Sequence, residues 1–220
     1  MSYHASLDGI YMPPRIKRLP VDKRGFPVPK FVAIIDGEPD HRVVNAAWFG
    51  PATRHRLCWL CGEPMGRYYT SIIGCMCSVN RIISEPPSHR DCAEWAVRGC
   101  PFLSRPHAHR REAGLPEDAR DAAGEGLKRN PGVVCLWISR EYPTPTKVWA
   151  GNEGVLYQLK DPIETIWYRE GRLATRQEVI DAIDEGLPTL MDIAKGESQR
   201  AVEALKRMTK HAMHYLPAAA

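Results

Sequence analysis

The chain has 220 residues, of which 44% are hydrophobic and 25% are charged, and its net charge is +4. These fractions are those of an ordinary soluble, globular protein. The longest apolar runs, FVAII and VVCLWIS among them, are far shorter than the roughly 20 residues of a membrane-spanning helix, so no membrane partner is expected. The first residues lack the apolar core of a secretion signal, which predicts a cytoplasmic protein.

Residues 1–57 are predicted to form a proline-rich arm and a β-hairpin. Prolines at positions 13, 14, 20, 27 and 29 alternate with basic residues, a pattern that favours an extended arm lying across another part of the molecule. The runs FVAII and HRVV, separated by the turn sequence DGEPD, predict two paired strands. The segment carries nine Lys or Arg against five Asp or Glu. Such an excess suits either phosphate contacts or a solvated basic face.

Five of the seven cysteines fall between Cys58 and Cys92. In a reducing cytosol, an odd and clustered set favours metal ligands and core thiols over disulfides. Cys58 and Cys61 form C-x-x-C-G, in which a tight turn points two sulfurs at one ion and Gly62 lets the backbone fold beneath them. Residues 65–82 then have β-type composition with a reversal near Gly74, so we expect a hairpin.

A second pair of ligands comes from the sequence PSHRDCAEW. Ser88 is expected to cap a helix that ends at about Gly99, and His89 and Cys92 share one face of its first turn. Because Zn²⁺ prefers four tetrahedral nitrogen or sulfur ligands, the sequence predicts a structural zinc site. Its ligands are Cys58, Cys61, His89 and Cys92.

Two other cysteines offer an alternative second pair. Cys75 and Cys77 form C-x-C on one face of an expected strand and could replace His89 and Cys92 as ligands. Cys100 is expected to pack beneath the helix end, and Cys135 to be a small core residue.

Turn, hairpin and helix over residues 58–102 resemble the treble-clef zinc finger. The chain is also similar to a family of uncharacterised bacteriophage and prophage proteins, through the blocks LCW-x-CG, PPSHRDCAEW, CPFLSRP and GLKRNPGV. This resemblance implies a phage or prophage origin and the cytoplasm of a bacterial cell, and it implies no activity for any residue.

Residues 103–131 are predicted to be a connector, and residues 132–220 to hold a small sheet and C-terminal helices. Segments 132–139, 154–159 and 164–170 are rich in β-branched and aromatic residues and predict three strands. Thr175 and Glu178 form a capping box that begins a helix, which we expect Gly186 and Pro188 to break. A last helix spans about 197–216. Together the elements predict an α+β fold, packed as one domain.

Three functions remain open, and the first is nucleic-acid binding. Basic residues beside the zinc helix would contact phosphates, namely Arg90, Arg98, Arg105, Arg110 and Arg111, together with the basic arm. Tyr68 and Tyr69 would stack on unpaired bases.

The alternatives are a protein-interaction module that binds a host or defence protein, and an unrecognised enzyme. The proline-rich arm and a zinc-fixed surface suit the first of these. A zinc-finger nuclease of the HNH type is disfavoured because no histidine occurs between His55 and His89, and no P-loop or G-x-S-x-G motif is present. His107 and His109 offer a metal ligand or a base, although loop histidines are more often solvated.

Overall fold

The computed structural model describes residues 2–105, 109, 113–115, 123, 132–148 and 154–218. Its helices are η1 Ala5–Leu7, α1 Pro14–Lys17, α2 Ala46–Arg54, α3 Cys75–Asn80, α4 Arg90–Gly99, α5 Pro101–Ser104, α6 Arg176–Glu197, α7 Gln199–Ala212 and η2 Met213–Tyr215. Its strands are β1 Val32–Ile35, β2 Glu38–Val44, β3 Tyr69–Gly74, β4 Ile82–Ile83, β5 Val134–Ser139, β6 Thr144–Val148, β7 Gly154–Gln158, β8 Glu164–Arg169 and β9 Arg172–Leu173. The fold is α+β, as predicted. Most of the expected connector lies outside the described residues.

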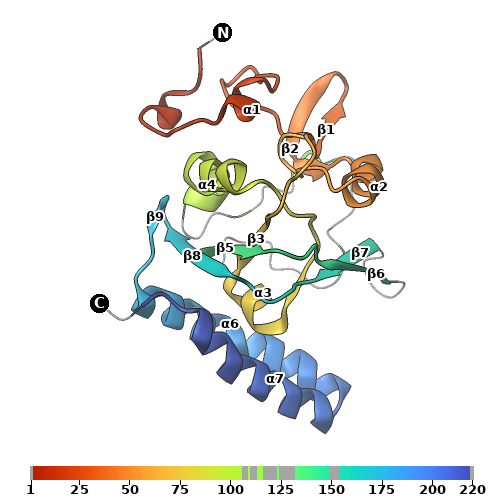
Figure 1. Ribbon diagram of the computed structural model, residues 1–220, viewed down its shortest axis with the longest axis vertical. Helices are drawn as coiled ribbons and strands as arrows, with labels where there is room; N and C mark the ends of the chain where they lie inside the picture. Colours follow the sequence, from red (N-terminus) through yellow and green to blue (C-terminus); the bar gives the residue numbers. More distant parts are fainter. Residues whose placement is uncertain are drawn as a thin grey trace.

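The elements lie in successive layers along the long axis of the molecule (Figure 1). The N-terminal arm and the β1–β2 hairpin lie at one end, and α4 lies between them and the central strands. The pair α6 and α7 covers the opposite side of these strands, beyond α3. No helix among the described residues is both long enough and apolar enough to cross a bilayer.

The N-terminal hairpin is confirmed. Strands β1 and β2 pair antiparallel, and the turn residues Asp36 and Gly37 have φ angles of 49° and 81°. Two successive positive φ angles are typical of a type I′ turn, which matches the twist of a two-stranded ribbon. Helix α2, which follows, is not expected from the sequence because Gly50 and Pro51 lie inside it.

The central sheet has the order β3-β5-β8-β9, with every neighbouring pair antiparallel. A second sheet has the order β4-β7-β6. Strands β5, β7 and β8 confirm the three segments predicted in the C-terminal part of the chain. Strand β6 was not expected because it contains Pro145. It is an edge strand, in which a residue without an N–H is tolerated, and Pro145 lies opposite Tyr157 of β7.

The hairpin expected over residues 65–82 is wrong. Strand β3 ends at Gly74, where the chain enters helix α3 instead of a return strand, and Arg81 ends that helix in the left-handed conformation at φ 62°. The pairing partner of β3 is β5, with Gly74 opposite Val134. Cys75 and Cys77 therefore lie on a helix and not on a strand. The resemblance to a treble clef holds for the C-x-x-C turn and the helix, but not for the segment between them.

Strand β5 forms the centre of the core. All of its residues are buried. Val134 and Leu136 belong to an apolar cluster with Ala93 of α4. Cys135 and Trp137 belong to a second cluster, which includes residues of α3, α6 and α7. The strand therefore alternates between α4 on one face and the C-terminal layer on the other, and Cys135 is the core residue that the sequence predicts.

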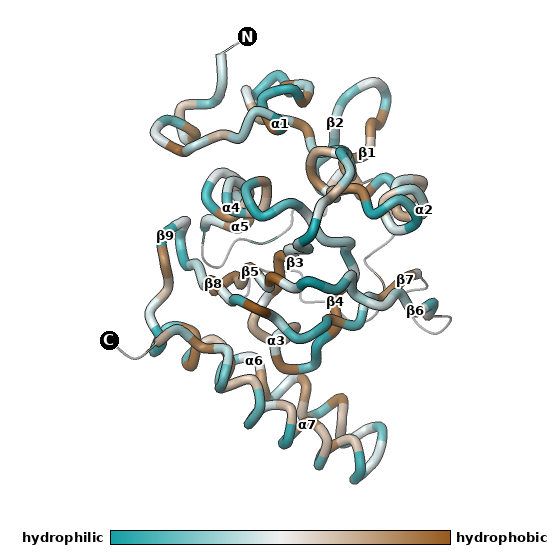
Figure 2. The backbone as a smooth tube through the Cα atoms, in the orientation of Figure 1, coloured by the Kyte–Doolittle hydropathy of each residue, from teal (hydrophilic) through white to brown (hydrophobic). Residues whose placement is uncertain are grey.

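The C-terminal helices differ from expectation at one point. The predicted capping box is present, since the Thr175 side chain accepts from Glu178 N–H and the Glu178 carboxylate accepts from Thr175 N–H. Helix α6, however, continues through Gly186 and Pro188 without a break. A Cβ at Gly186 would lie 2.8 Å from Met76 Sδ, so this glycine permits close packing of α3. Helix α7 alternates polar and apolar positions along its length (Figure 2).

Candidate metal centre

The first half of the site is the turn between Cys58 and Cys61. Gly62 N–H donates to the Cys58 carbonyl at 2.9 Å, and Cys58 N–H donates to the Glu63 carbonyl at 2.8 Å. Gly62 has a φ of +80°, a conformation that other residues rarely adopt. The turn therefore folds back beneath the two sulfurs, as the C-x-x-C-G pattern predicts.

The second half is the start of helix α4. His89 is its N-cap residue and Cys92 lies in its first turn. The expected cap, Ser88, instead forms a backbone bridge with Thr70, which leaves the α4 N-cap without a side-chain hydrogen bond. The two halves are tied together by the backbone, because Trp59 N–H of the turn donates to the Pro87 carbonyl at 3.1 Å.

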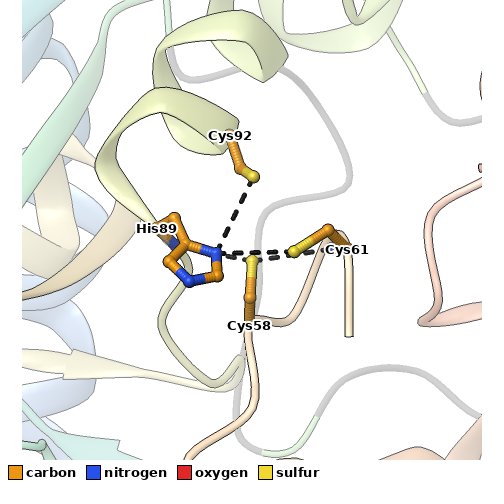
Figure 3. Close-up of side chains that lie close together, drawn as sticks. All are labelled: Cys58, Cys61, His89 and Cys92. Atoms are coloured by element: carbon orange, nitrogen blue, oxygen red, sulfur yellow. Dashed lines mark hydrogen bonds between the residues drawn. The ribbon is translucent and has the colours of Figure 1, made fainter. Parts of the chain in front are cut away.

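The four side chains converge on one point (Figure 3). The ligand atoms of Cys58, Cys61, His89 and Cys92 all lie within 4.8 Å of one another, and the three cysteines are buried. His89 Nδ1 is 3.4 Å from Cys61 Sγ and 3.9 Å from Cys92 Sγ. In a tetrahedral zinc site, Zn–S distances of about 2.3 Å and Zn–N distances of about 2.0 Å place a sulfur about 3.5 Å from a nitrogen. The donor set and its spacing therefore suit a zinc ion.

The surrounding hydrogen bonds fix the donors in the form that a metal requires. His89 Nε2 lies 3.1 Å from the Pro64 carbonyl, which accepts only from a protonated nitrogen, so Nδ1 is left as the donor to a metal. Cys58 Sγ accepts from the backbone N–H of Cys61 at 3.5 Å and of His89 at 3.4 Å. Donors of this kind stabilise a thiolate.

The electrostatics of the cluster favour a bound cation. Burial alone would raise the pKa of Cys58, but hydrogen bonds with Cys61, Cys92 and His89 lower it well below the ordinary thiol value. Burial also lowers the pKa of His89, yet the neighbouring thiolates of Cys58 and Cys61 raise it overall, to about 10. A site that draws a proton so strongly to an imidazole has a negative potential at the position of Nδ1.

The basic arm lies directly over this centre. Arg15 Nη1 donates to both carboxylate oxygens of Asp91, at 2.9 and 3.0 Å, and Arg15 Nε is 3.8 Å from Glu63. Arg18 forms an ion pair with Glu63 and lowers the pKa of that carboxyl. Glu63 belongs to the cysteine turn and Asp91 to the zinc helix. One arm therefore contacts both halves of the site, and its cations would offset the excess negative charge of three thiolates around a bound divalent ion.

Apolar side chains also join the arm to the metal centre. Leu7, Met12, Ile16 and Leu19 of the arm are buried in one cluster with the ligand cysteines and Trp95 of α4. The arm thus lies across another part of the molecule, as expected, but it is not extended throughout, because it contains the short helices η1 and α1. Arg15 and Arg18, expected to contact phosphates, are instead engaged in ion pairs with acids of the centre.

The remaining cysteines lie away from the four donors. Cys75 Sγ donates to the Ala182 carbonyl at 3.3 Å, and burial raises the pKa values of Cys75 and Cys77 to about 12 and about 11. Cys100 caps the end of α4, with its pKa raised by burial. Thiols of this kind are structural rather than reactive.

The predicted nucleic-acid residues fall into three groups. Arg90 is held by acids, since it donates to Glu94 and, through two nitrogens at 2.7 and 2.9 Å, to Glu164. Arg98 lies over the ring of Tyr168 at 5.5 Å, and Arg105 is exposed. Arg110 and Arg111 lie outside the described residues, as does His107, which the sequence offers as a metal ligand or a base.

The sequence does not reveal the contacts that support the four metal donors from outside the cluster. The Pro64 carbonyl follows the C-x-x-C-G pattern, but a backbone acceptor leaves no trace in residue type. The Arg15–Asp91 pair joins positions 76 residues apart, and no local pattern relates them.

No protein family, curated protein or solved structure matches the chain in these comparisons. The nature of the site is therefore inferred from its four donors and their geometry.

Proposed function

We propose that this chain is a zinc-stabilised protein that binds nucleic acid. The observation that carries the zinc part is the convergence of Cys58, Cys61, His89 and Cys92 from two segments. All four tetrahedral positions are supplied by protein, so an ion held here has no position left for a substrate or a reactive water. Zinc would contribute folding free energy, and the chemistry of the chain would be that of binding.

Cations beside the centre support nucleic acid as the partner. Arg98 and Arg105 follow the zinc-held start of α4, both are exposed, and among the described residues neither forms an ion pair. Arginines of this kind contact phosphates without reading sequence. Because Arg90 already pairs with Glu164, it would have to exchange that partner to contribute.

Zinc content and nucleic-acid binding are tested separately. The purified chain should contain about one zinc ion per molecule by elemental mass spectrometry. A labelled oligonucleotide should bind with an affinity that falls as salt rises, and Arg98→Ala with Arg105→Ala should weaken binding. An exposed arginine elsewhere gives the control, Arg200→Ala on α7. A zinc-loaded chain that binds neither single strands nor duplex would refute the second part alone.

A protein-interaction module is the second candidate, favoured by the outer surface of the arm. Tyr11 is 71% exposed, and with Tyr3 and Ile10 it lines a shallow groove of about 360 Å³. Exposed aromatic residues beside a groove are typical of interaction sites. A phage origin, implied by the resemblance in sequence, would make a host or defence protein the partner. Capture of one defined host protein after nuclease treatment, lost on Tyr11→Ala, would favour this candidate.

A further inference from the structure

Segments that carry four exposed arginines and one exposed tyrosine lie next to the metal centre. The chain after α2 runs beside the chain after the cysteine turn, since Met65 N–H donates to the Arg56 carbonyl at 3.0 Å and Leu57 bridges Pro64. The latter chain enters β3, whose first residue Tyr69 pairs with Ser139 at the end of β5. We use the name free-arginine face for the exposed residues of these neighbouring segments and of the end of α2, namely Arg54, Arg56, Arg67, Tyr68 and Arg140.

The cations of this face are not neutralised. In the part of the chain that the structure describes, Arg54, Arg67 and Arg140 form no ion pair. Elsewhere in the described chain, several arginines form ion pairs with an acid, namely Arg15–Asp91, Arg42–Asp40, Arg90–Glu164 and Arg172–Glu178. Within residues 54–57, 64–69 and 139–142 the sequence has a single acid, Glu141. Among the described residues, the face therefore has an excess of positive charge, which favours an anionic ligand.

Aromatic rings lie among these cations. The Arg56 guanidinium lies 6.0 Å from the ring centres of both Tyr69 and Tyr142, and its Nη1 donates to the Tyr69 hydroxyl at 3.3 Å. Tyr69 is only 6% exposed, so the stacking role predicted for it is wrong. Tyr68 is 41% exposed and leaves one ring available to solvent at the same end of the β3–β5 ladder as Arg140.

We propose that the free-arginine face binds a single-stranded nucleic acid, with Arg67 and Arg140 on the phosphates and Tyr68 stacked on a base. This inference rests on the proposed function, to which it adds a second surface, separate from Arg98 and Arg105, and a preferred form of nucleic acid. An accessible ring between cations suits single strands because an unpaired base presents its face for stacking, whereas the bases of a duplex are already stacked. Phosphate contacts without base-edge readout give little dependence on sequence.

Fluorescence anisotropy with the zinc-loaded full chain tests the face. The probes are a labelled single strand of mixed sequence, about 20 nucleotides long and so longer than one such site, and the same strand in a duplex. Arg67→Ala with Arg140→Ala should weaken single-strand binding roughly tenfold and reduce the slope of log affinity against log salt by about 1.4, since each phosphate contact contributes about 0.7. The matched control, Arg200→Ala with Lys206→Ala, removes the same charge from exposed positions of α7 and should bind as the wild type does.

Tyr68 separates stacking from charge. Tyr68→Ala should lose roughly tenfold in single-strand affinity, whereas Tyr68→Phe, which keeps the ring, should not. All the substituted side chains are exposed, so zinc content and melting temperature should match the wild type. Duplex binding as tight as single-strand binding, unaffected by Tyr68→Ala, would overturn the single-strand assignment. Full binding by the Arg67/Arg140 variant, in a wild type that does bind, would overturn the face and leave the proposed function standing. Absence of binding by the wild type would overturn both.

Discussion

Replacing Cys61 by serine removes one of the four donors of the metal centre. Zinc at a structural site contributes roughly 10–16 kcal/mol of apparent binding free energy in small peptides, comparable with the roughly 5–15 kcal/mol that stabilises a whole domain. Even a loss of about 3 kcal/mol would lower the melting temperature of a chain of this size by roughly 6–12 °C. We expect Cys61→Ser to lose its zinc and to have a melting temperature lower by at least this amount.

The structure predicts where the damage should appear. The ligand cysteines share an apolar cluster with the arm residues Ile16 and Leu19, whereas β5 also packs in a separate cluster against the C-terminal helices. Hydrogen exchange should therefore speed up at the Leu19 amide, which donates to Ile16, and at the Lys30 amide, which donates to Leu60. The amides of β5 should keep most of their protection.

Cys77→Ala is the matched control. It removes a half-buried thiol of α3 that lies outside the metal cluster, at a cost of about 1 kcal/mol. It should retain zinc, and the arm should exchange as in the wild type. Full zinc content in Cys61→Ser, or an equal loss of zinc in Cys77→Ala, would show that the donors have been misassigned. Equal loss of protection in β5 and the arm would refute the local reasoning.

Two further predictions concern the C-terminal helices. Gly196→Ala, with no neighbour within 4 Å, should stabilise the fold by about 0.5–1 kcal/mol, whereas Gly186→Ala should stabilise it less, because its methyl group would lie 2.8 Å from Met76 Sδ and the flexible Met76 side chain must shift. An equal or larger gain for Gly186→Ala in thermal melts would contradict this packing. Glu178, whose pKa Arg172 lowers from 4.5 to about 2, should stabilise the fold fully above pH 4.5 and progressively less as the pH falls toward 2. Glu178→Gln should accordingly cost a few tenths to about 1 kcal/mol at pH 7, given the exposure of the pair, and a melting difference that persists at pH 2 would count against it.

Short-range signals account for the parts that the sequence predicts well. The two positive φ angles of Asp36 and Gly37 are of a kind that an Asp-Gly turn adopts readily, and the Thr175 cap needs only a glutamate at the third helical position. The metal donors are also predicted by short-range signals. Cys58 and Cys61 are brought together by one turn, and His89 and Cys92 by one turn of helix, so each pair is visible from its spacing.

Long-range contacts account for the parts that it does not. The segment 65–82 has strand-like composition, but composition does not specify a partner, and β3 pairs with β5 across the connector rather than with its own continuation. The residues directly after β3, which have no strand partner in the described chain, form helix α3, and α3 packs on α6 at Gly186. Pro188 likewise remains within α6, since packing of the helix against α3 and α7 offsets the hydrogen bond that a proline lacks.

The metal centre and the free-arginine face share one stretch of backbone, so a bound zinc would also help to position the face that we propose. The Pro64 carbonyl holds His89, and the next amide, of Met65, holds the Arg56 carbonyl. Arg67 follows directly along the same chain and leads into β3. The position of Arg56 relative to Arg67 would therefore depend on the geometry of the cysteine turn. A chain that lost a bound metal should keep Arg67 and Arg140 together through the β3–β5 ladder, in which Tyr69 pairs with Ser139, but its Arg56–Met65 contact should be less well fixed.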